Sequence, residues 1–293
     1  MFDGIEVQRN TLLAPYTTLR IGGPTDYLAF PKNQEELFLL MKEARNIGMP
    51  THFLGGGSNL LIHDDGVRGL VIHLSGDFNK LEVSSDGCKV SVGAAYSFPK
   101  LTRRALELGW ETALGWGGVP GGVGGALKMN AGTPLGELGE VVSHVEAVTP
   151  AGPLVLQHVD MCFSYRNTQF PENAVLCKVY LKCLSPRPER RTDLLHQALL
   201  LAKKRKQTQP KKRSAGSMFK NPKGDFAGRL IEACGLKGKQ IGGACVSEVH
   251  ANFLLNYEKA SAEDMFKLSE LVRKTVYDKF GIKLEYEVRR WGF

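Results

Sequence analysis

The sequence predicts an α+β protein in two parts, an N-terminal part with two lobes and a C-terminal part that begins near Thr192. Its length of 293 residues allows about two domains. Short runs with strand patterns alternate with amphipathic helical stretches along the chain. A cluster of prolines and charges at residues 186–191 interrupts this pattern, which places the boundary between the two parts there.

The first predicted elements form a small β-α-β unit. Residues 25–30 predict a strand, and Asn33 predicts the N-cap of the helix that follows. Gly48 ends this helix, whose apolar face is formed by Leu37, Leu40, Met41, Ala44 and Ile47. Residues 51–54 predict the next strand, which leads directly into the glycine-rich loop at 55–59. A loop in this place is a common position for a ligand.

More strands are predicted in the rest of the first part, whose lobes we expect at about 1–74 and 75–191. Residues 67–74 and 81–92 alternate apolar and polar side chains, and the Asp86-Gly87 pair predicts a hairpin turn. Further strands are predicted at 141–149, 154–159 and 174–184.

The second part, residues 192–293, is predicted to carry the remaining helices. One is expected over residues 194–206. Another begins at Ser261, with Asp264 completing a capping box and an apolar stripe at Met265, Leu268, Val272 and Val276. A final strand is predicted at 283–290.

Composition and charge narrow the class of protein. A chain with 43% hydrophobic and 23% charged residues is typical of a globular protein. It begins without a secretory signal pattern and has no apolar stretch long enough to span a bilayer, so we expect a cytoplasmic protein without membrane insertion. Its net charge of +8 favours polyanionic partners but does not separate nucleic acid from phosphorylated small molecules.

The cysteines do not indicate a metal site or a disulfide framework, because they lack a CxxC pair and a Cys/His ligand spacing. Buried free thiols are the expectation for all six: Cys88, Cys162, Cys177, Cys183, Cys234 and Cys245.

Two glycine-rich blocks dominate the first half, GGGSN at 55–59 and GGVPGGVGGA at 117–126, which continues to Gly132. Such loops bring backbone N–H groups close to anionic oxygens, because glycine allows positive φ and has no side chain to obstruct the approach. GGGSN alone is equally well explained as a tight turn, but the pair favours a diphosphate ligand. Neither block has the spacing of a Rossmann fingerprint or a P-loop.

These blocks resemble the flavin-binding domain shared by the vanillyl-alcohol oxidase and CO-dehydrogenase flavoproteins. The matching segments are 17–31, 54–72 and 117–132. Within that group the chain is similar to the UDP-N-acetylenolpyruvoylglucosamine reductase (MurB) family, as shown by three further segments: 162–170, 214–222 and 284–292. Because 171–205 leaves no room for a substrate-covering insertion, the resemblance implies the shorter subclass. The chain departs from the family pattern at Thr133-Pro134-Leu135 and in VPGGVGG, which concerns the local pose of the flavin loop.

The resemblance implies a function and its cofactors. Bound FAD would pass a hydride from NADPH to the enolpyruvyl ether of UDP-N-acetylglucosamine, giving UDP-N-acetylmuramate for peptidoglycan synthesis. The implied FAD-binding residues are Arg20, Gly22, Gly55, Gly56, Gly57, Ser58, Asn59, Gly118, Pro120, Gly121, Gly122, Gly124, Gly125, Asn130, Ala131 and Gly132. The implied substrate-binding residues are Tyr165, Lys206 and Asn221, with Arg205 an alternative to Lys206.

Three residues match the catalytic positions of the family. Arg166 would bind the substrate carboxylate as negative charge accumulates there, since a guanidinium donates two parallel hydrogen bonds. Ser217 would protonate the carbanion as general acid. Glu287 lies on the final predicted strand, which the resemblance implies returns to the active site. It would help to polarise the intermediate, especially if burial keeps it protonated. Spacing alone would favour a surface arginine for Arg166, a turn or helix cap for Ser217 and an ordinary strand residue for Glu287.

Several alternatives stay open at this point. Tyr165 is as well explained as a core aromatic residue, and we assign no catalytic step to His250. Within enzymes, a flavin oxidase of the same fold is the second hypothesis. Outside enzymes, the cationic runs at 203–206 and 211–213 suggest a nucleic-acid-binding module, although a solvated helix face is their ordinary explanation. We expect no nucleic acid partner.

Overall fold

The structure is a computed structural model that describes residues 2, 4–171 and 173–293. The chain divides into two compact units, and each is built from three separate stretches of sequence. Unit 1 comprises Met1–Gln8, Tyr27–Gly56 and Gly69–Lys203, and unit 2 comprises Arg9–Asp26, Gly57–Arg68 and Lys204–Phe293. The domain boundary expected at 191/192 stays a prediction. The two units are each made of several stretches of sequence, so they do not test a single boundary.

One sheet of the fold has four strands in the order β1-β2-β5-β3, and β3 runs parallel to β5. The division between the units falls inside three of them. Their bounds are β1 Val7–Leu12, β2 Pro24–Ala29, β3 Thr51–Phe53 and β5 Val67–Ile72. Helix α1, Gln34–Asn46, begins as expected at Asn33, whose side chain accepts a hydrogen bond from the Glu36 backbone at 2.9 Å.

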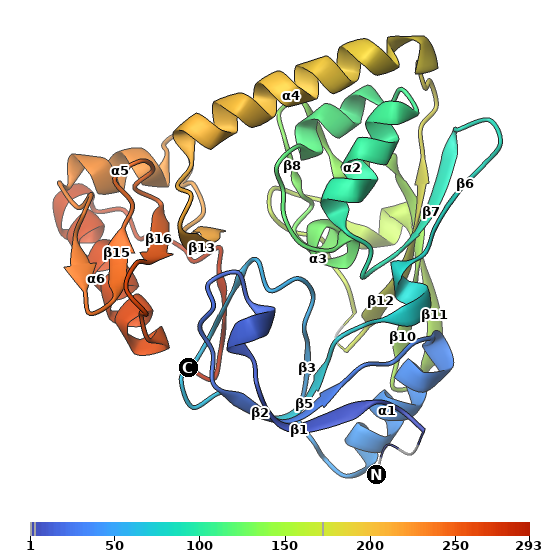
Figure 1. Cartoon of the computed structure of the whole chain (residues 1–293), viewed down its shortest axis with the longest axis horizontal. Helices are drawn as coiled ribbons and strands as arrows, with labels where there is room; N and C mark the ends of the chain where they lie inside the picture. Colours follow the sequence, from blue (N-terminus) through green and yellow to red (C-terminus); the bar gives the residue numbers. More distant parts are fainter. Residues whose placement is uncertain (1, 3, 172) are drawn as a thin grey trace. The chain divides into compact units, whose positions relative to one another are not determined.

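The second sheet lies in unit 1 and has five antiparallel strands in the order β11-β10-β12-β7-β6. Figure 1 shows α2 and α3 on one face of this sheet, where Trp110 and Trp116 are fully buried in their shared core. The bounds are β6 Leu81–Val83, β7 Lys89–Gly93, α2 Phe98–Glu107, α3 Val123–Lys128, β10 Val142–Thr149, β11 Gly152–Gln157 and β12 Val175–Lys182. A two-residue hairpin adds β8 Gly132–Thr133 and β9 Gly136–Glu137.

Helix α1 contributes to a core of its own in unit 1. Its buried side chains Leu37, Leu40 and Met41 pack with residues of β5 and with Val148 and Cys177 of the five-stranded sheet. Ile47, expected on this face, is instead 51% exposed, because it lies at the C-cap, where the helix has already ended.

Unit 2 packs helices α5 and α6 against a four-stranded sheet in the order β13-β16-β15-β14 (Figure 1). The predicted capping box at the start of α6 is confirmed, because Ser261 and Asp264 exchange side-chain and backbone hydrogen bonds. The predicted stripe of Met265, Leu268, Val272 and Val276 is fully buried. The bounds are α4 Arg191–Thr208, β13 Arg213–Ser217, α5 Ala227–Ala233, β14 Gln240–Ile241, β15 Ala244–Val246, β16 Phe253–Asn256 and α6 Ala262–Phe280; α4 crosses the division.

The final strand is shorter than the sequence suggested. Only β17, Arg289–Trp291, is a strand, and it pairs in parallel with β4, Leu60–Ile62. The prediction of a strand over 283–290 was therefore wrong for most of its length. Residues 285–287 instead make single contacts with residues 218–220, since these segments lie along each other without forming a continuous ladder.

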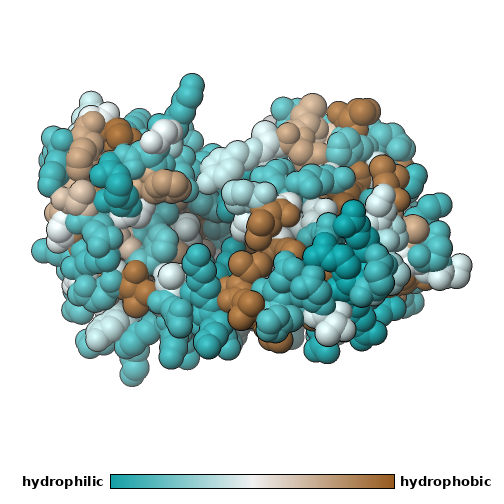
Figure 2. Space-filling model, turned by 90° about the horizontal axis from the view of Figure 1, so that it is seen from above, coloured by the Kyte–Doolittle hydropathy of each residue, from teal (hydrophilic) through white to brown (hydrophobic). Residues whose placement is uncertain are grey.

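All six cysteines are free thiols, but burial holds for only two of them, Cys177 and Cys245. Cys162 is exposed, which corrects the expectation, because it ends a 3₁₀ turn in the left-handed conformation. Burial raises the pKa of Cys177 to about 12. Within the described ranges, no helix is long and apolar enough to cross a membrane. Figure 2 shows hydrophilic residues over most of the face in view, with smaller apolar patches between them.

Candidate active site

The two glycine-rich blocks touch each other within unit 1. A Cβ added to Gly56 would lie 2.7 Å from the Cα of Gly121, so the two loops approach as closely as glycine allows. Gly121 has φ +94° and Gly118 has φ +76°, values that other residues rarely adopt. A Cβ on Gly55 or Gly125 would meet no protein atom within 4 Å. The paired loops therefore leave open space beside backbone that carries no side chain.

The second half of the GGGSN block belongs to unit 2. Gly57 has φ +58°, and a Cβ there would lie 2.1 Å from the Tyr16 carbonyl oxygen, so only glycine fits. The amide group of Asn59 donates to the carbonyl oxygen of Glu287 at 3.1 Å, and the carbonyl oxygen of Asn59 accepts from Arg289 N–H at 3.0 Å. These bonds fix the end of the glycine loop beside the C-terminal segment that carries Glu287.

Two predicted cofactor residues have structural contacts of their own. Gly22 packs against Ile62: a Cβ added to Gly22 would lie 3.0 Å from the Cβ of Ile62. This close packing explains the glycine at this position without a bound ligand. Arg20, which has φ +57°, donates to the Pro15 carbonyl oxygen and lines a cationic pocket in unit 2. Ser58 is half-buried in the same unit.

Arg166 lies at the tip of a tight turn in unit 1. Ser164 and Asn167 close the turn with two backbone hydrogen bonds of 3.0 and 3.1 Å. Arg166 itself has φ +56°, a conformation that costs a non-glycine residue about 1 kcal/mol or more. Its guanidinium donates to the Gly132 carbonyl oxygen at 3.2 Å and lies 5.4 Å from the ring centre of Tyr165. The strained turn thus presents Arg166 at the end of the second glycine-rich block.

Asn130 ties this turn to the flavin loop through its own side chain. The amide is 2% exposed, donates to Glu137 at 2.6 Å and to the Ser164 carbonyl oxygen at 3.4 Å, and accepts from Gly139 N–H at 3.0 Å. Its side chain is therefore occupied inside the protein. The departure at Thr133-Pro134-Leu135 lies in the β8–β9 hairpin, where Leu135 is 55% exposed. The other predicted residues of this block are Pro120, Gly122, Gly124 and Ala131, all in unit 1.

Ser217 ends strand β13 in unit 2, and the backbone that follows it is held from both sides. Ser217 pairs with Phe253 of β16, and Met218 N–H donates to the Asn252 carbonyl oxygen at 2.8 Å. On the other side, Glu287 N–H donates to the Met218 carbonyl oxygen at 2.9 Å. The structure therefore brings the segments of Ser217 and Glu287 together, with both residues half-buried.

Asn252 is a positioning residue that the sequence argument missed. Its side chain is 3% exposed, accepts from Phe219 N–H at 3.0 Å and donates to the Phe219 carbonyl oxygen at 2.8 Å. One buried amide thus satisfies both polar groups of a residue that lies two positions after Ser217. The signal in the sequence is its place two residues after His250, in a segment to which we assign no catalytic step.

We expect Asn252→Ala to lower the free energy of unfolding by about 2–4 kcal/mol, because it leaves two buried backbone groups without partners. Thermal or denaturant unfolding measures this loss. The control is Asn46→Ala, at the exposed end of α1, which should change stability by less than about 0.5 kcal/mol. Equal stabilities of the two variants would show that the two hydrogen bonds between Asn252 and Phe219 do not stabilise the fold.

Tyr286 joins the Glu287 segment to helix α6. Its hydroxyl lies 2.6 Å from Ser269 Oγ and donates to Glu270 at 2.6 Å, and the Arg290 guanidinium lies 4.1 Å from its ring centre. Burial and the hydrogen bond to Glu270 raise the pKa of Tyr286 to about 12, so the phenol stays a neutral donor. The ring also packs on Phe219 at a centroid distance of 5.2 Å.

The predicted substrate residues lie in different places. Asn221 is exposed, and its Oδ1 accepts from Ala227 N–H at 3.1 Å at the start of α5. Lys206 is exposed near the end of α4, while Arg205 is half-buried. Tyr165 is 54% exposed, which excludes the core explanation for it. Burial lowers the pKa of His250, whose Nδ1 accepts from Asn252 N–H at 3.2 Å.

Comparison with known proteins identifies the family. A family model for an FAD binding domain matches residues 25–156, and one for the C-terminal domain of UDP-N-acetylenolpyruvoylglucosamine reductase matches residues 209–291. The UDP-N-acetylenolpyruvoylglucosamine reductase of Anaeromyxobacter sp. (strain Fw109-5) is 42% identical over 288 residues, covering 98% of this chain and 89% of the relative. The chain belongs to the UDP-N-acetylenolpyruvoylglucosamine reductase family.

Other MurB relatives agree over nearly the full length. The enzyme of Moorella thermoacetica is 39% identical over 98% of this chain and 94% of its own. The crystal structure of MurB from Thermus caldophilus superposes with a TM-score of 0.85 at 37% identity, covering 98% of this chain and 99% of that one. The predicted family and the α+β fold with an FAD-binding part are confirmed, and the chain is an FAD-dependent oxidoreductase that uses NADPH.

Proposed function

We propose that the chain reduces the enolpyruvyl ether of UDP-N-acetylglucosamine to UDP-N-acetylmuramate, with bound FAD as cofactor and NADPH as hydride donor. Family membership supports this reaction. The structural observation that carries the site assignment is the hydrogen-bonded group in unit 2, in which Glu287 meets Met218 beside Ser217 and Asn59 of the glycine loop. Because nucleotide sugars and NADPH are cytoplasmic, we also propose the cytoplasm as its location.

The glycine loops fit FAD. Gly55 and Gly125 border open space that a Cβ would enter, and Gly56 packs on Gly121 so closely that no side chain covers the backbone between the loops. Backbone of this kind accepts a diphosphate group, whose oxygens bind N–H groups. Bound FAD would supply two-electron chemistry, accepting hydride from NADPH and passing it to the enolpyruvyl carbon.

Arg166 would bind the substrate carboxylate. Reduction of the enolpyruvyl double bond leaves carbanion character on the carbon beside this carboxylate, so negative charge grows there. A guanidinium that donates two parallel hydrogen bonds stabilises this charge. The hydrogen bond to Gly132 and the cation–π contact with Tyr165 support the role, because they limit the positions that a long side chain can adopt.

Ser217 would donate the proton that completes the reduction, and Glu287 would help to polarise the intermediate. A general acid must be held within hydrogen-bond reach of the atom that it protonates, and the bonds around Met218 and Phe219 hold this segment on both sides. Asn221, Lys206 and Tyr165 are the residues that we propose for substrate binding, and the first two belong to unit 2.

The flavin cradle makes a specific prediction. Gly55→Ala and Gly125→Ala add a methyl group to space that no protein atom fills, so both variants should fold, and alanine in helix α3 should not lower stability. Both should nevertheless weaken FAD binding at least about tenfold, since the methyl group enters the cofactor space. Flavin absorbance per protein and the melting temperature measure the two effects separately.

The comparison for this prediction is Gly56→Val, which must displace Gly121 and should lose stability together with flavin. Full flavin occupancy in both alanine variants would show that the cofactor lies elsewhere.

The proposed reaction is tested by a single-turnover experiment. The purified protein should show flavin absorbance that NADPH bleaches and that the enolpyruvyl sugar restores. Restoration by oxygen alone, at a rate that the sugar does not change, would favour an oxidase instead.

A further inference from the structure

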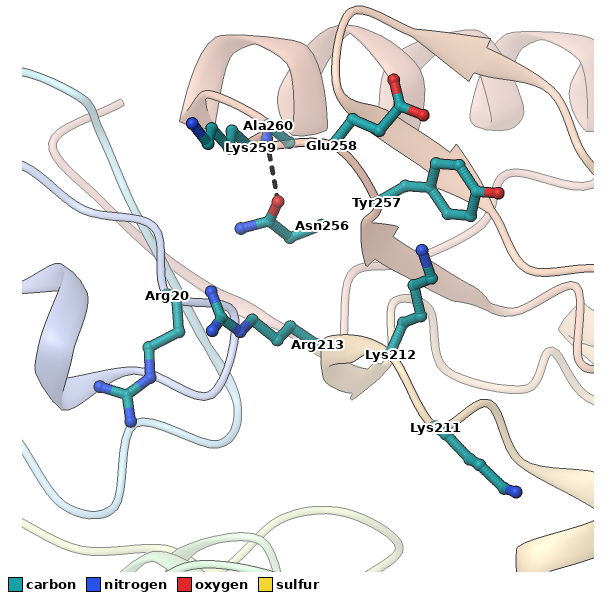
Figure 3. Close-up of a pocket in the computed structure, with 9 residues that line it drawn as sticks. All are labelled: Arg20, Lys211, Lys212, Arg213, Asn256, Tyr257, Glu258, Lys259 and Ala260. Carbon is teal, nitrogen blue, oxygen red and sulfur yellow. Dashed lines mark hydrogen bonds between the residues drawn. The ribbon is translucent and has the colours of Figure 1, made fainter.

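A second cavity with anion-binding chemistry lies wholly within unit 2, whereas Gly55, Gly56, Gly121 and Gly125 lie in unit 1. Its volume is about 590 Å³, which falls in the range of nucleotide-sized ligand sites. Figure 3 shows it, and its lining residues are Arg20, Lys211, Lys212, Arg213, Asn256, Tyr257, Glu258, Lys259 and Ala260.

The charge of this cavity is one-sided. Five of its residues are cationic and one, Glu258, is acidic. None of the five forms an ion pair with a carboxylate among the residues that the structure describes. Like charges gathered without internal counterions repel one another, so the arrangement costs stability unless an anion is bound. In Figure 3 the Arg213 side chain extends toward the backbone of Arg20, whose own guanidinium points away from it, and the Glu258 carboxylate points away from both.

The backbone holds the two arginines in place. The Thr18 hydroxyl donates to the Ser214 carbonyl oxygen at 2.7 Å, so the segments that carry Arg20 and Arg213 are joined directly. Asn256 then fixes the opposite wall, because its amide group donates to the Leu19 carbonyl oxygen at 2.8 Å and its Oδ1 accepts from Ala260 N–H at 2.9 Å. The cavity is therefore built by three segments that are hydrogen-bonded to one another.

Two residues of the cavity adopt strained backbone conformations. Arg20 has φ +57° and Lys259 has φ +54°, although neither is a glycine or an asparagine. Such conformations persist where the surrounding structure imposes them, and they gather at ligand sites. Lys212 is also ordered, since its ammonium group lies 3.7 Å from the ring centre of Tyr257.

We propose that this cavity binds a diphosphate group, with Arg213 as its main contact and Arg20, whose guanidinium also donates to the Pro15 carbonyl oxygen, beside it. Guanidinium groups bind phosphate oxygens in pairs, and Lys212 and Lys259 would add point charges at the sides. The group can belong to inorganic diphosphate or to a nucleotide, and the volume admits either. This site uses none of the residues assigned to catalysis. Arg20, which the family resemblance places among the FAD-binding residues, is assigned here to the cavity instead, because it lines it.

The test is isothermal titration of the flavin-loaded protein with inorganic diphosphate. The double variant Arg20→Gln/Arg213→Gln should bind it at least about tenfold more weakly than the parent, since each pair of charged hydrogen bonds is worth that much or more. The matched control is Arg45→Gln/Arg191→Gln, which removes two exposed arginines elsewhere and should leave the affinity unchanged. An equal loss in both variants, or no binding to the parent, would overturn the proposal.

Flavin content separates this site from the cofactor site. The pocket variant should retain the flavin of the parent, and loss of flavin would assign the two arginines to FAD and overturn a separate site. If the pocket variant does not fold, Arg213→Lys keeps the charge but loses the paired geometry and should still weaken binding severalfold. Titration with UDP distinguishes a nucleotide from inorganic diphosphate. If the cavity binds nucleotides, the pocket variant should bind one UDP molecule fewer than the parent; if it binds only inorganic diphosphate, the two proteins should bind the same number of UDP molecules. The activity assay is independent of these readouts.

Discussion

Ser217→Ala is expected to accept hydride from NADPH at a near-normal rate and then to stall in the reduced state when the enolpyruvyl sugar is added. Reduction of this substrate must place a proton on the carbon beside the carboxylate, and a positioned general acid contributes on the order of 10²- to 10⁴-fold. The rate of flavin reoxidation by substrate, followed by stopped-flow absorbance, should fall by that factor. Ser217→Cys should retain more activity, since a thiol also donates a proton.

The control for this prediction is Ser214→Ala, three residues earlier on the same strand. Thr18 bonds to the backbone carbonyl oxygen of Ser214, which the substitution preserves, so both half-reactions should continue at the parental rate. The proposed mechanism fails at its central step if Ser217→Ala reoxidises as fast as the parent.

Arg166→Gly is expected to slow substrate reduction by about 10²- to 10³-fold while leaving flavin reduction by NADPH nearly unchanged, because the guanidinium is assigned to charge that develops only with the sugar substrate. Stability should change little. Glycine adopts φ +56° without strain, and this gain of about 1 kcal/mol offsets the lost bond to Gly132. Glu287→Gln is expected to show the same split between the half-reactions.

Asn173→Gly is the backbone control for this variant, since Asn173 also has a positive φ of 63°. It should leave both half-reactions intact. Arg166→Lys keeps the charge but not the paired hydrogen bonds, so its rate should lie between those of glycine and arginine. Equal losses in the two half-reactions would point to damaged flavin binding and against the assigned role.

Local signals in the sequence were sufficient for the helices that have clear caps. Asn33 and Ser261 begin α1 and α6 as expected, because a side-chain cap is a short-range interaction that four residues encode. Helix α2 was not anticipated, although its Phe98, Leu101 and Ala105 are all buried. The final strand was overpredicted, since an alternating pattern does not say whether a partner strand runs beside it.

The site was predictable in its residue types and not in its contacts. Family motifs pointed to Arg166, Ser217 and Glu287. The hydrogen bonds of Asn252 to Phe219 depend instead on β13 and β16 lying together, which no spacing in the sequence reveals. Asn130 shows the opposite case, because its place in the motif suggested a ligand contact and its side chain is occupied within the protein. Pairing between distant segments decides such roles.

The three-stretch construction of unit 2 has a consequence for the order in which the chain is made. Strand β4 at Leu60–Ile62 pairs with β17 at Arg289–Trp291, which is synthesised much later. At about 5–20 residues per second, the early stretch waits on the order of 10–45 s for that partner. Leu61 and Ile62, almost fully buried in the finished fold, are exposed during this interval. The nascent chain therefore carries an apolar strand with an open edge until β17 has been made, and such an edge can pair with other chains.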